Sequence, residues 1–297
     1  GKVYALDLGT GKKLWEFQTG DAVEASPCVV NGTVFVGSSD AHLYAIDADS
    51  GKQRWKYKTG DKILGAANWV SSPEDGATWI LVGSYDSNLY CIDAETGEKV
   101  WEYKTGSFVN GAPAVADGTA VFGGCDAVIH VVSVDDGSVV HHIDAGAYIA
   151  GSAASADERA YIGHYGNKFL SADITAGDIV WTYEDREFAY FSSPAVGQKV
   201  VVVGSRDKQV HCIDRESGKA VWTFPTRDMV DSSPAICDGK VIVGSNDGVL
   251  YMLRLSDGKE VWSYPIGDAV TASPAVAGGM IVVGSDDGYV YAFGAAQ

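Results

Sequence analysis

The sequence predicts an all-β fold: a seven-bladed β-propeller made of four-stranded antiparallel sheets. One phrase, GSSDAHLYAIDADSGKQRW at residues 37–55, recurs along nearly all of the 297-residue chain. The tryptophan that ends this phrase returns about every forty residues, a period typical of stacked supersecondary units. Each repeat holds four short β-branched or aromatic segments separated by Gly, Asp and Asn, and no window shows helical periodicity. Sheets arranged radially leave only short edges unpaired.

Each of the four expected strands of a repeat has its own sequence. The first carries Ser-Pro-Ala-Val, as at 273–276, and the second is a β-branched run that ends in Gly-Ser, as at 280–285. The third reads Leu-Tyr-Ala-Ile-Asp, as at 43–47, and the fourth holds the tryptophan. We therefore expect one propeller domain over residues 1–297, with blades at about 22–58, 62–104, 108–144, 148–184, 189–224, 229–264, and 269–294 combined with 11–18.

The two ends of the chain each contain a copy of the third strand, at residues 3–7 and 289–293. Seven four-stranded blades have room for only one of these two copies. We expect the N- and C-terminal strands to share one composite blade that closes the ring and removes its open edge. Either the C-terminal copy takes the third position in that blade, or the N-terminal copy frays.

Acidic residues recur at the turn between the second and third strands. A Gly-Ser-x-Asp pattern, or a close variant, places them at Asp40, Asp86, Asp126, Asp207, Asp247 and Asp287. Equivalent acidic residues around a ring could suggest bound calcium, but short Asp side chains also accept backbone N–H bonds in tight turns. We expect turn caps. The following turn, Asp-x-x-(Ser/Thr)-Gly, ends in a glycine that can adopt positive φ.

The phrase Ala-x-Asp-x-x-Thr-Gly-x-x-x-Trp, best seen in YCIDAETGEKVW at 90–101, resembles the repeat of the PQQ-like (quinoprotein-type) β-propellers. In that family the tryptophan docks between neighbouring blades, against the Thr-Gly turn. The resemblance implies this docking role for Trp15, Trp55, Trp101, Trp181, Trp222 and Trp262. His141 stands where a further tryptophan is expected, so we expect a weaker joint next to the third blade.

Composition excludes several classes of function. The formal charge is −17, with 39 acidic against 22 basic residues, which argues against binding to nucleic acid or to anionic membrane surfaces. No apolar run reaches the ~18 residues that span a bilayer. The chain opens inside a repeat without a signal peptide, so we expect a mature form trimmed from a longer one. The five cysteines are scattered, never adjacent, and expected to be core residues.

The residues do not support catalysis. PQQ-dependent dehydrogenases resemble this chain in their repeat, but their sites carry adjacent cysteines, calcium ligands and a catalytic aspartate, and no Cys-Cys pair occurs here. The usual nucleophile and zinc-protease motifs are also missing. We predict no catalytic residue, no bound PQQ or calcium, and no metal site. His141 and His142 are neighbours on a strand and point to opposite faces, so they are not a chelating pair.

The positions at which the repeats differ are the better candidates for a functional site. The segment from Trp181 to Pro194 is one residue longer than its counterparts and places Arg186 beside Phe188, Tyr190 and Phe191. Arginine with aromatic residues on a loop is the composition of a binding hot spot. Phe188 and Tyr190 can equally fill the core between blades, and Phe188 is the better candidate for that.

Propeller geometry places this loop on the same face as the turns between the second and third strands. We therefore expect one partner-binding face, formed by Arg186, Tyr190, Phe191, His164, Tyr165, Arg206 and Tyr85. A second irregularity, the insertion at 71–79, projects from the opposite face. Its neighbouring tryptophans, Trp69 and Trp79, either cap the blade or present a second contact.

The sequence therefore predicts a monomeric, non-catalytic propeller that binds a protein or peptide. It is similar to the propeller lipoprotein of the bacterial outer-membrane protein assembly machinery, and to propeller sensor segments of bacterial Ser/Thr kinases. The resemblance implies a periplasmic or otherwise extracytoplasmic location. The alternatives are a small-ligand or quinone (PQQ) binder that uses the central channel, and a degenerate quinoprotein dehydrogenase.

Overall fold

The computed structural model describes residues 1–294, and its regular elements in this range are strands and turns. The chain is an all-β, seven-bladed propeller, as predicted. It divides into two compact units, described separately below: residues 1–158 with 174–177, and residues 159–173 with 178–297. No helix long and apolar enough to cross a membrane occurs in the described part of the chain.

The first unit contains the N-terminal hairpin, the strands of the first three four-stranded sheets and the first strand of the fourth. Its strands are β1 (Lys2–Leu6), β2 (Lys13–Gln18), β3 (Cys28–Val30), β4 (Thr33–Gly37), β5 (His42–Asp47), β6 (Gln53–Lys58), β7 (Asn68–Ser71), β8 (Thr78–Gly83), β9 (Asn88–Asp93), β10 (Lys99–Lys104), β11 (Ala114–Ala116), β12 (Thr119–Gly123), β13 (Val128–Ser133), β14 (Val139–Asp144) and β15 (Ala154–Ala156).

The second unit contains the remaining strands. They are β16 (Arg159–Gly163), β17 (Phe169–Asp173), β18 (Asp178–Tyr183), β19 (Ala195–Val196), β20 (Val200–Ser205), β21 (Gln209–Asp214), β22 (Ala220–Pro225), β23 (Ala235–Cys237), β24 (Lys240–Gly244), β25 (Val249–Arg254), β26 (Glu260–Pro265), β27 (Ala275–Ala277), β28 (Met280–Gly284) and β29 (Val290–Gly294).

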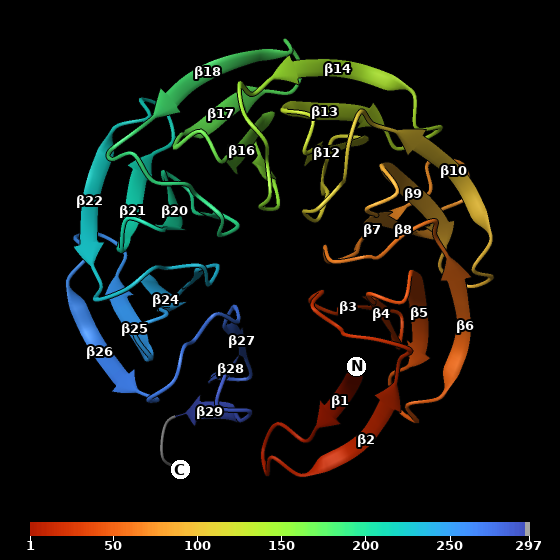
Figure 1. Ribbon diagram of the computed structural model, residues 1–297, viewed down its shortest axis with the longest axis horizontal. Helices are drawn as coiled ribbons and strands as arrows, with labels where there is room; N and C mark the ends of the chain where they lie inside the picture. The colour runs from red at the N-terminus through yellow and green to blue at the C-terminus, as the bar shows by residue number, and fades with distance from the viewer. Residues whose placement is uncertain (295–297) are drawn as a thin grey trace. The chain divides into compact units, whose positions relative to one another are not determined.

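In each four-stranded sheet the strands lie side by side in chain order and pair antiparallel (Figure 1). Burial explains why the four strands differ in sequence. All five residues of β4 are buried, and so is the centre of β5, so both strands are apolar on both faces. In β6, exposed basic residues alternate with half-buried Trp55 and Tyr57, which is the pattern of a strand with one solvated face.

Each pair of third and fourth strands contains a β-bulge that the sequence reasoning did not foresee. Ala45 pairs with Trp55, but Ile46 pairs with Gln53, so Arg54 is an extra residue. The register shifts at the same place in the other six such pairs. A bulge bends its strand and re-aims the adjacent side chain. Here it lies immediately before the tryptophan, which must turn out of its own sheet to reach the next one.

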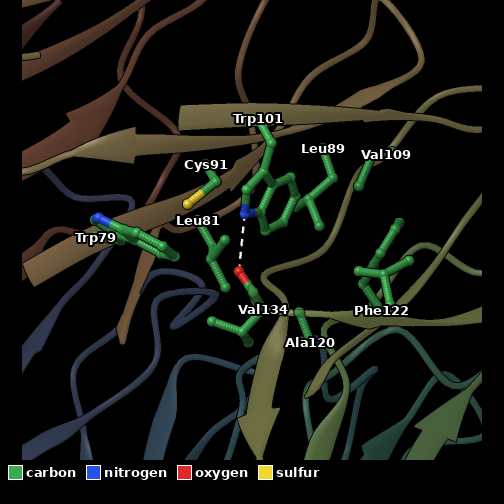
Figure 2. Close-up of a cluster of buried hydrophobic side chains, with 10 residues drawn as sticks. Trp79, Leu81, Leu89, Cys91, Trp101, Val109, Ala120, Phe122 and Val134 are labelled. Carbon is green, nitrogen blue, oxygen red and sulfur yellow. Dashed lines mark hydrogen bonds between the residues drawn. The ribbon is translucent and has the colours of Figure 1, made fainter. Parts of the chain in front are cut away.

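Five of the six tryptophans predicted to dock donate a hydrogen bond to the backbone of the next sheet, as Trp101 shows, whereas Trp262 packs against Ile281 and Phe293. Trp101 is 8% exposed and lies with Leu81, Leu89 and Cys91 in a core cluster that continues into the next sheet (Figure 2). Its Nε1 donates a hydrogen bond of 2.8 Å to the carbonyl oxygen of Val134 (Figure 2). Equivalent bonds run from Trp15 to Ala48, from Trp55 to Ala94, from Trp181 to Arg215 and from Trp222 to Leu255.

His141 makes the same bond with a smaller ring. Its Nε2 lies 2.9 Å from the carbonyl oxygen of Thr175. Its ring lies against Gly177 as the Trp101 ring lies against Gly137, at a glycine with positive φ where a Cβ atom would collide with the ring. The imidazole therefore keeps the polar contact of the joint and gives up part of the apolar area.

The ends of the chain supply the remaining strands. The N-terminal hairpin β1–β2 and the C-terminal sheet β27–β28–β29 are consistent with a seventh blade built from both ends. The C-terminal copy of the third strand holds the third position of its sheet, where Val290 pairs with Gly284. The alternative expectation, that the N-terminal copy frays, is wrong, because residues Lys2–Leu6 pair with β2 along their whole length.

Candidate protein-binding face

The recurring aspartates between the second and third strands cap their own turns, as Asp40 Oδ1 does by accepting the His42 amide at 3.0 Å. In the first blade, Asp40 Oδ2 accepts a hydrogen bond from the Gly20 amide at 2.7 Å and one from the Tyr44 hydroxyl at 2.5 Å. Burial, together with the bond to Asp40, raises the pKa of Tyr44 to about 12. Tyr90, Tyr251 and Tyr291 bond the aspartates of their own turns in the same way.

The histidines at the tyrosine position are also engaged within the protein. His130 lies 3.1 Å from Asp126 Oδ2 and 3.0 Å from the Tyr103 hydroxyl. His142 contacts the same hydroxyl at 2.7 Å, whereas His141 points to Thr175. Burial lowers the pKa of His130 even though Asp126 acts against that shift.

Three of the predicted face residues assemble in the second unit into one cluster, which we call the aromatic–arginine patch: Tyr165, Phe191 and Arg206. The ring centroids of Tyr165 and Phe191 are 4.4 Å apart, and Arg206 Cζ lies 3.9 Å from the Phe191 centroid. Tyr165 is 50% exposed, and the other two are half-buried. Cation–π contact and ring packing hold these side chains in place before any partner arrives.

Asp231 fixes the arginine of the patch, and sequence reasoning did not assign it a role. Arg206 Nε and Nη2 donate to the two carboxylate oxygens of Asp231 at 2.9 and 3.1 Å. This bidentate geometry leaves the guanidinium little rotational freedom. The repeat could have indicated this contact. Phe191 and Asp231 occupy equivalent positions in consecutive blades, so their side chains are expected to lie near each other.

Two residues predicted for the face are buried. Tyr190 is 1% exposed and packs with Phe169, Tyr183 and His211 in the core, and burial raises its pKa. Its inclusion in the binding face is therefore wrong. His164 is 2% exposed; its Nδ1 accepts the Gly166 amide, and its Nε2 has no hydrogen-bond partner. Burial also lowers the pKa of His164, and its inclusion is wrong for the same reason.

The preference for Phe188 as the core residue is wrong as well. Phe188 is 49% exposed, and Arg186 is exposed beside it on the same loop. The loop turns between them through a bond of 2.9 Å from the Phe188 amide to the Arg186 carbonyl oxygen. In this connection Tyr190 therefore holds the core position, and Phe188 lies in solvent.

Tyr85 belongs to the first unit and forms a separate cluster there. Its ring stacks on Phe108 with a centroid distance of 4.8 Å and an interplanar angle of 15°. Lys62 Nζ lies 4.4 Å from the Tyr85 centroid, and Phe108 is 44% exposed. Phe108 was not among the residues predicted for the face. The cluster repeats the chemistry of the patch: aromatic rings with one cation.

A family model described as outer membrane protein assembly factor BamB matches residues 1–74, 71–188 and 189–293. The chain belongs to this family. The predicted resemblance to PQQ-like propellers and to the propeller of the assembly machinery is thereby confirmed. BamB from Moraxella catarrhalis has a similar structure at 19% identity, with a TM-score of 0.78 over 95% of this chain and 88% of that one.

A second similar structure is the computationally designed protein Ika8. It has 17% identity and a TM-score of 0.88, and the match covers 99% of this chain and 91% of that one. At such low identities both likenesses show the fold alone. The search of curated proteins returned no match.

The insertion of this BamB-family chain frames a cavity in the first unit. Trp79 is buried and Trp69 is exposed, so one caps the blade and the other faces solvent. Asn31 Nδ2 donates to Thr78 Oγ1 at 2.9 Å across the two sheets. Beside this bond lies a half-open cavity of about 510 Å³ whose walls include Arg54, Asp93 and Glu95. Arg54 is already paired with Asp47 at 2.6 Å, so the cavity offers no free cation to a ligand.

Proposed function

We propose that the chain is a non-catalytic propeller scaffold that binds another protein through the aromatic–arginine patch. The single observation that carries this proposal is the arrangement of Tyr165, Phe191 and Arg206. It combines a half-exposed tyrosine with an arginine that is stacked on a ring and also held by a carboxylate. Aromatic and arginine side chains dominate binding hot spots, and rigid side chains lose less entropy when they bind.

Family membership supports a specific kind of partner. The matching family is described as an outer membrane protein assembly factor. We therefore infer that the partner is a protein component of such an assembly machinery and that the chain works in the extracytoplasmic space. The negative charge of the chain would steer it away from phosphate-rich surfaces and towards a partner with a basic rim.

The test is co-purification of assembly-machinery proteins with the tagged chain. Tyr165→Ala combined with Arg206→Ala removes the exposed ring and the fixed cation. Each is a hot-spot residue type, whose truncation costs ~2 kcal/mol, and we expect recovery of the partner to fall at least ~10-fold. Phe191 remains in place so that the core beneath the patch is preserved. Tyr190 is left intact, because its truncation would destabilise the core rather than test the surface.

Trp69→Ala is the matched control, because it also removes an exposed aromatic side chain. This variant should recover the partner as the wild type does, and all variants should melt at similar temperatures. Undiminished recovery by the folded double variant would refute the proposed face. Loss of recovery by Trp69→Ala alone would move the binding site to the insertion.

A further inference from the structure

Three potential metal ligands meet at the fifth blade: Asp185 after β18, Asp207 before β21, and His211 on β21. One ligand atom of each lies within 4.8 Å of the others. His211 Nε2 is 3.2 Å from Asp207 Oδ1, and these two side chains are 0% and 1% exposed. Asp185 is exposed, so an ion can enter from solvent on its side.

Comparison with the other blades shows that this carboxylate pair is a departure from the repeat. In four blades the turn aspartate accepts a backbone N–H from the connection that enters the blade. The donor and acceptor pairs are Gly20 and Asp40, Gly60 and Asp86, Gly106 and Asp126, and Arg227 and Asp247. In residues 1–294, Asp207 receives no such bond from the entering connection, and the carboxylate of Asp185 faces it instead.

Asp185 also differs from the residues at the equivalent position of the other repeats. It lies four residues after Trp181, where four of the six other repeats carry Thr19, Thr59, Thr105 and Thr226, and the remaining two carry Ala145 and Ile266. Each of those threonines donates its hydroxyl to a backbone carbonyl oxygen. An ionised aspartate cannot donate such a bond. The change therefore removes a structural hydrogen bond and adds a second negative charge next to a buried one.

Within residues 1–294, the group that bridges these two carboxylates is a neutral amide. Gln209 Nε2 lies 3.3 Å from Asp185 Oδ2 and 3.0 Å from Asp207 Oδ2. Among the ion pairs of the described residues, none joins Asp185 to a basic side chain. Like charges this close disfavour each other unless a cation lies between them. The bridging position held by the Gln209 amide is the position that a cation would take.

His211 is oriented to contribute a nitrogen ligand. Its Nδ1 lies 3.0 Å from the Tyr183 hydroxyl. The tautomer with its proton on Nδ1 donates to that oxygen and leaves the Nε2 lone pair for a cation, which would lie between Nε2 and the Asp207 carboxylate 3.2 Å away. A partner on the far nitrogen fixes both the tautomer and the ring orientation of a ligating histidine.

We propose that Asp185, Asp207 and His211 bind one divalent cation of the zinc class, with water completing its coordination. One imidazole nitrogen with two carboxylate oxygens suits zinc and its first-row neighbours, whereas calcium and magnesium prefer sites made of oxygen alone. The ion would tie the connection after β18 to the turn before β21, and so replace the backbone bond that the other blades use.

Isothermal titration of the purified chain with zinc chloride tests this proposal. A Cys237→Ser background removes the exposed thiol, which would otherwise compete for zinc. We expect about one zinc ion per chain, and no heat from calcium at the same concentration. Asp185→Thr and His211→Tyr install the residues that other blades carry at these positions, so both variants should fold. Each should weaken zinc binding at least ~10-fold.

Glu187→Gln is the matched control, because it removes one exposed carboxylate from the same loop. It should bind zinc as the background protein does. Zinc should also raise the melting temperature of the background protein and leave that of Asp185→Asn unchanged. This second measurement does not depend on substitutions taken from the other blades. Absence of zinc binding by the background protein would overturn the proposal. So would unchanged zinc affinity in both Asp185→Thr and His211→Tyr.

Discussion

Replacement of Trp101 by His tests what holds consecutive blades together. The chain itself uses histidine for this task at position 141, where the imidazole Nε2 lies 2.9 Å from the Thr175 carbonyl oxygen. Trp101→His should therefore keep a hydrogen bond to the Val134 carbonyl oxygen and lose only apolar contact. Trp101→Ala loses both, and leaves that buried carbonyl oxygen without a partner.

The magnitudes follow from the burial of the indole, which is 8% exposed. An indole buries ~200 Å² and an imidazole about a third less, so at ~25 cal/mol/Å² the loss of area costs ~1.5 kcal/mol. The cavity left in the cluster adds ~1 kcal/mol, which gives ~2.5 kcal/mol for Trp101→His. Trp101→Ala should cost ~5 kcal/mol, because a core truncation of ~4 kcal/mol is joined by ~1 kcal/mol for the orphaned carbonyl oxygen.

Guanidinium unfolding, followed by tryptophan fluorescence and by circular dichroism, gives these free energies where the two probes coincide. Trp69→Ala, a substitution at an exposed tryptophan, should change the free energy of unfolding by less than ~0.5 kcal/mol. If Trp101→His destabilises the protein as much as Trp101→Ala, the retained hydrogen bond does not support the joint. If Trp101→Ala costs less than ~1 kcal/mol, the indole does not hold the blades together at all.

Two further predictions concern buried groups. Burial lowers the pKa of His130 below its ordinary value of 6.5, so the unfolded chain binds this proton more readily and the wild type should lose stability as the pH falls below ~6.5. His130→Tyr, the residue of other blades, should lose less between pH 7 and 5 in thermal melts; an equal loss would contradict this linkage. Tyr190→Ala should cost ~4 kcal/mol in guanidinium unfolding, whereas Phe188→Ala should cost less than ~0.5 kcal/mol. The reverse order would contradict the core assignment of Tyr190.

The repeat explains why so much of the fold could be predicted from one sequence. Its period, its turn residues and its tryptophans are set by local chemistry, and each occurs several times. Comparison of equivalent positions in the repeats also predicts that Tyr190 is buried. It occupies the column of Ile63, Val109, Val230 and Val270, all of which are fully buried. Each of these side chains lies against a glycine in the second strand of the preceding sheet, where a Cβ atom would collide with it. The prediction that Tyr190 belongs to the binding face was wrong because it relied on residue type and not on the buried residues at the equivalent positions of the other repeats.

Other features could not be read from the sequence, because they depend on register and on contacts between repeats. The bulge before each tryptophan follows from a one-residue shift in strand pairing, and no residue type in the sequence predicts that shift. The bond between Arg206 and Asp231 joins residues 25 positions apart whose side chains meet only once two blades are packed. The approach of Asp185 to Asp207 likewise depends on where a connection one residue longer than its counterparts leaves the sheet.

The fifth blade shows how such a repeat acquires specific sites. The longer connection between Trp181 and Pro194 keeps Tyr190 in the core column and places Phe191 under Arg206. The same connection directs Asp185 towards Asp207 in place of a backbone donor. One added residue thus changes two neighbouring groups while the strands on either side keep their pairing. Because the paired sheets supply most of the stability, the sequence of the connection between Trp181 and Pro194 can change without loss of the fold. The proposed patch and the proposed metal site both include residues of this connection.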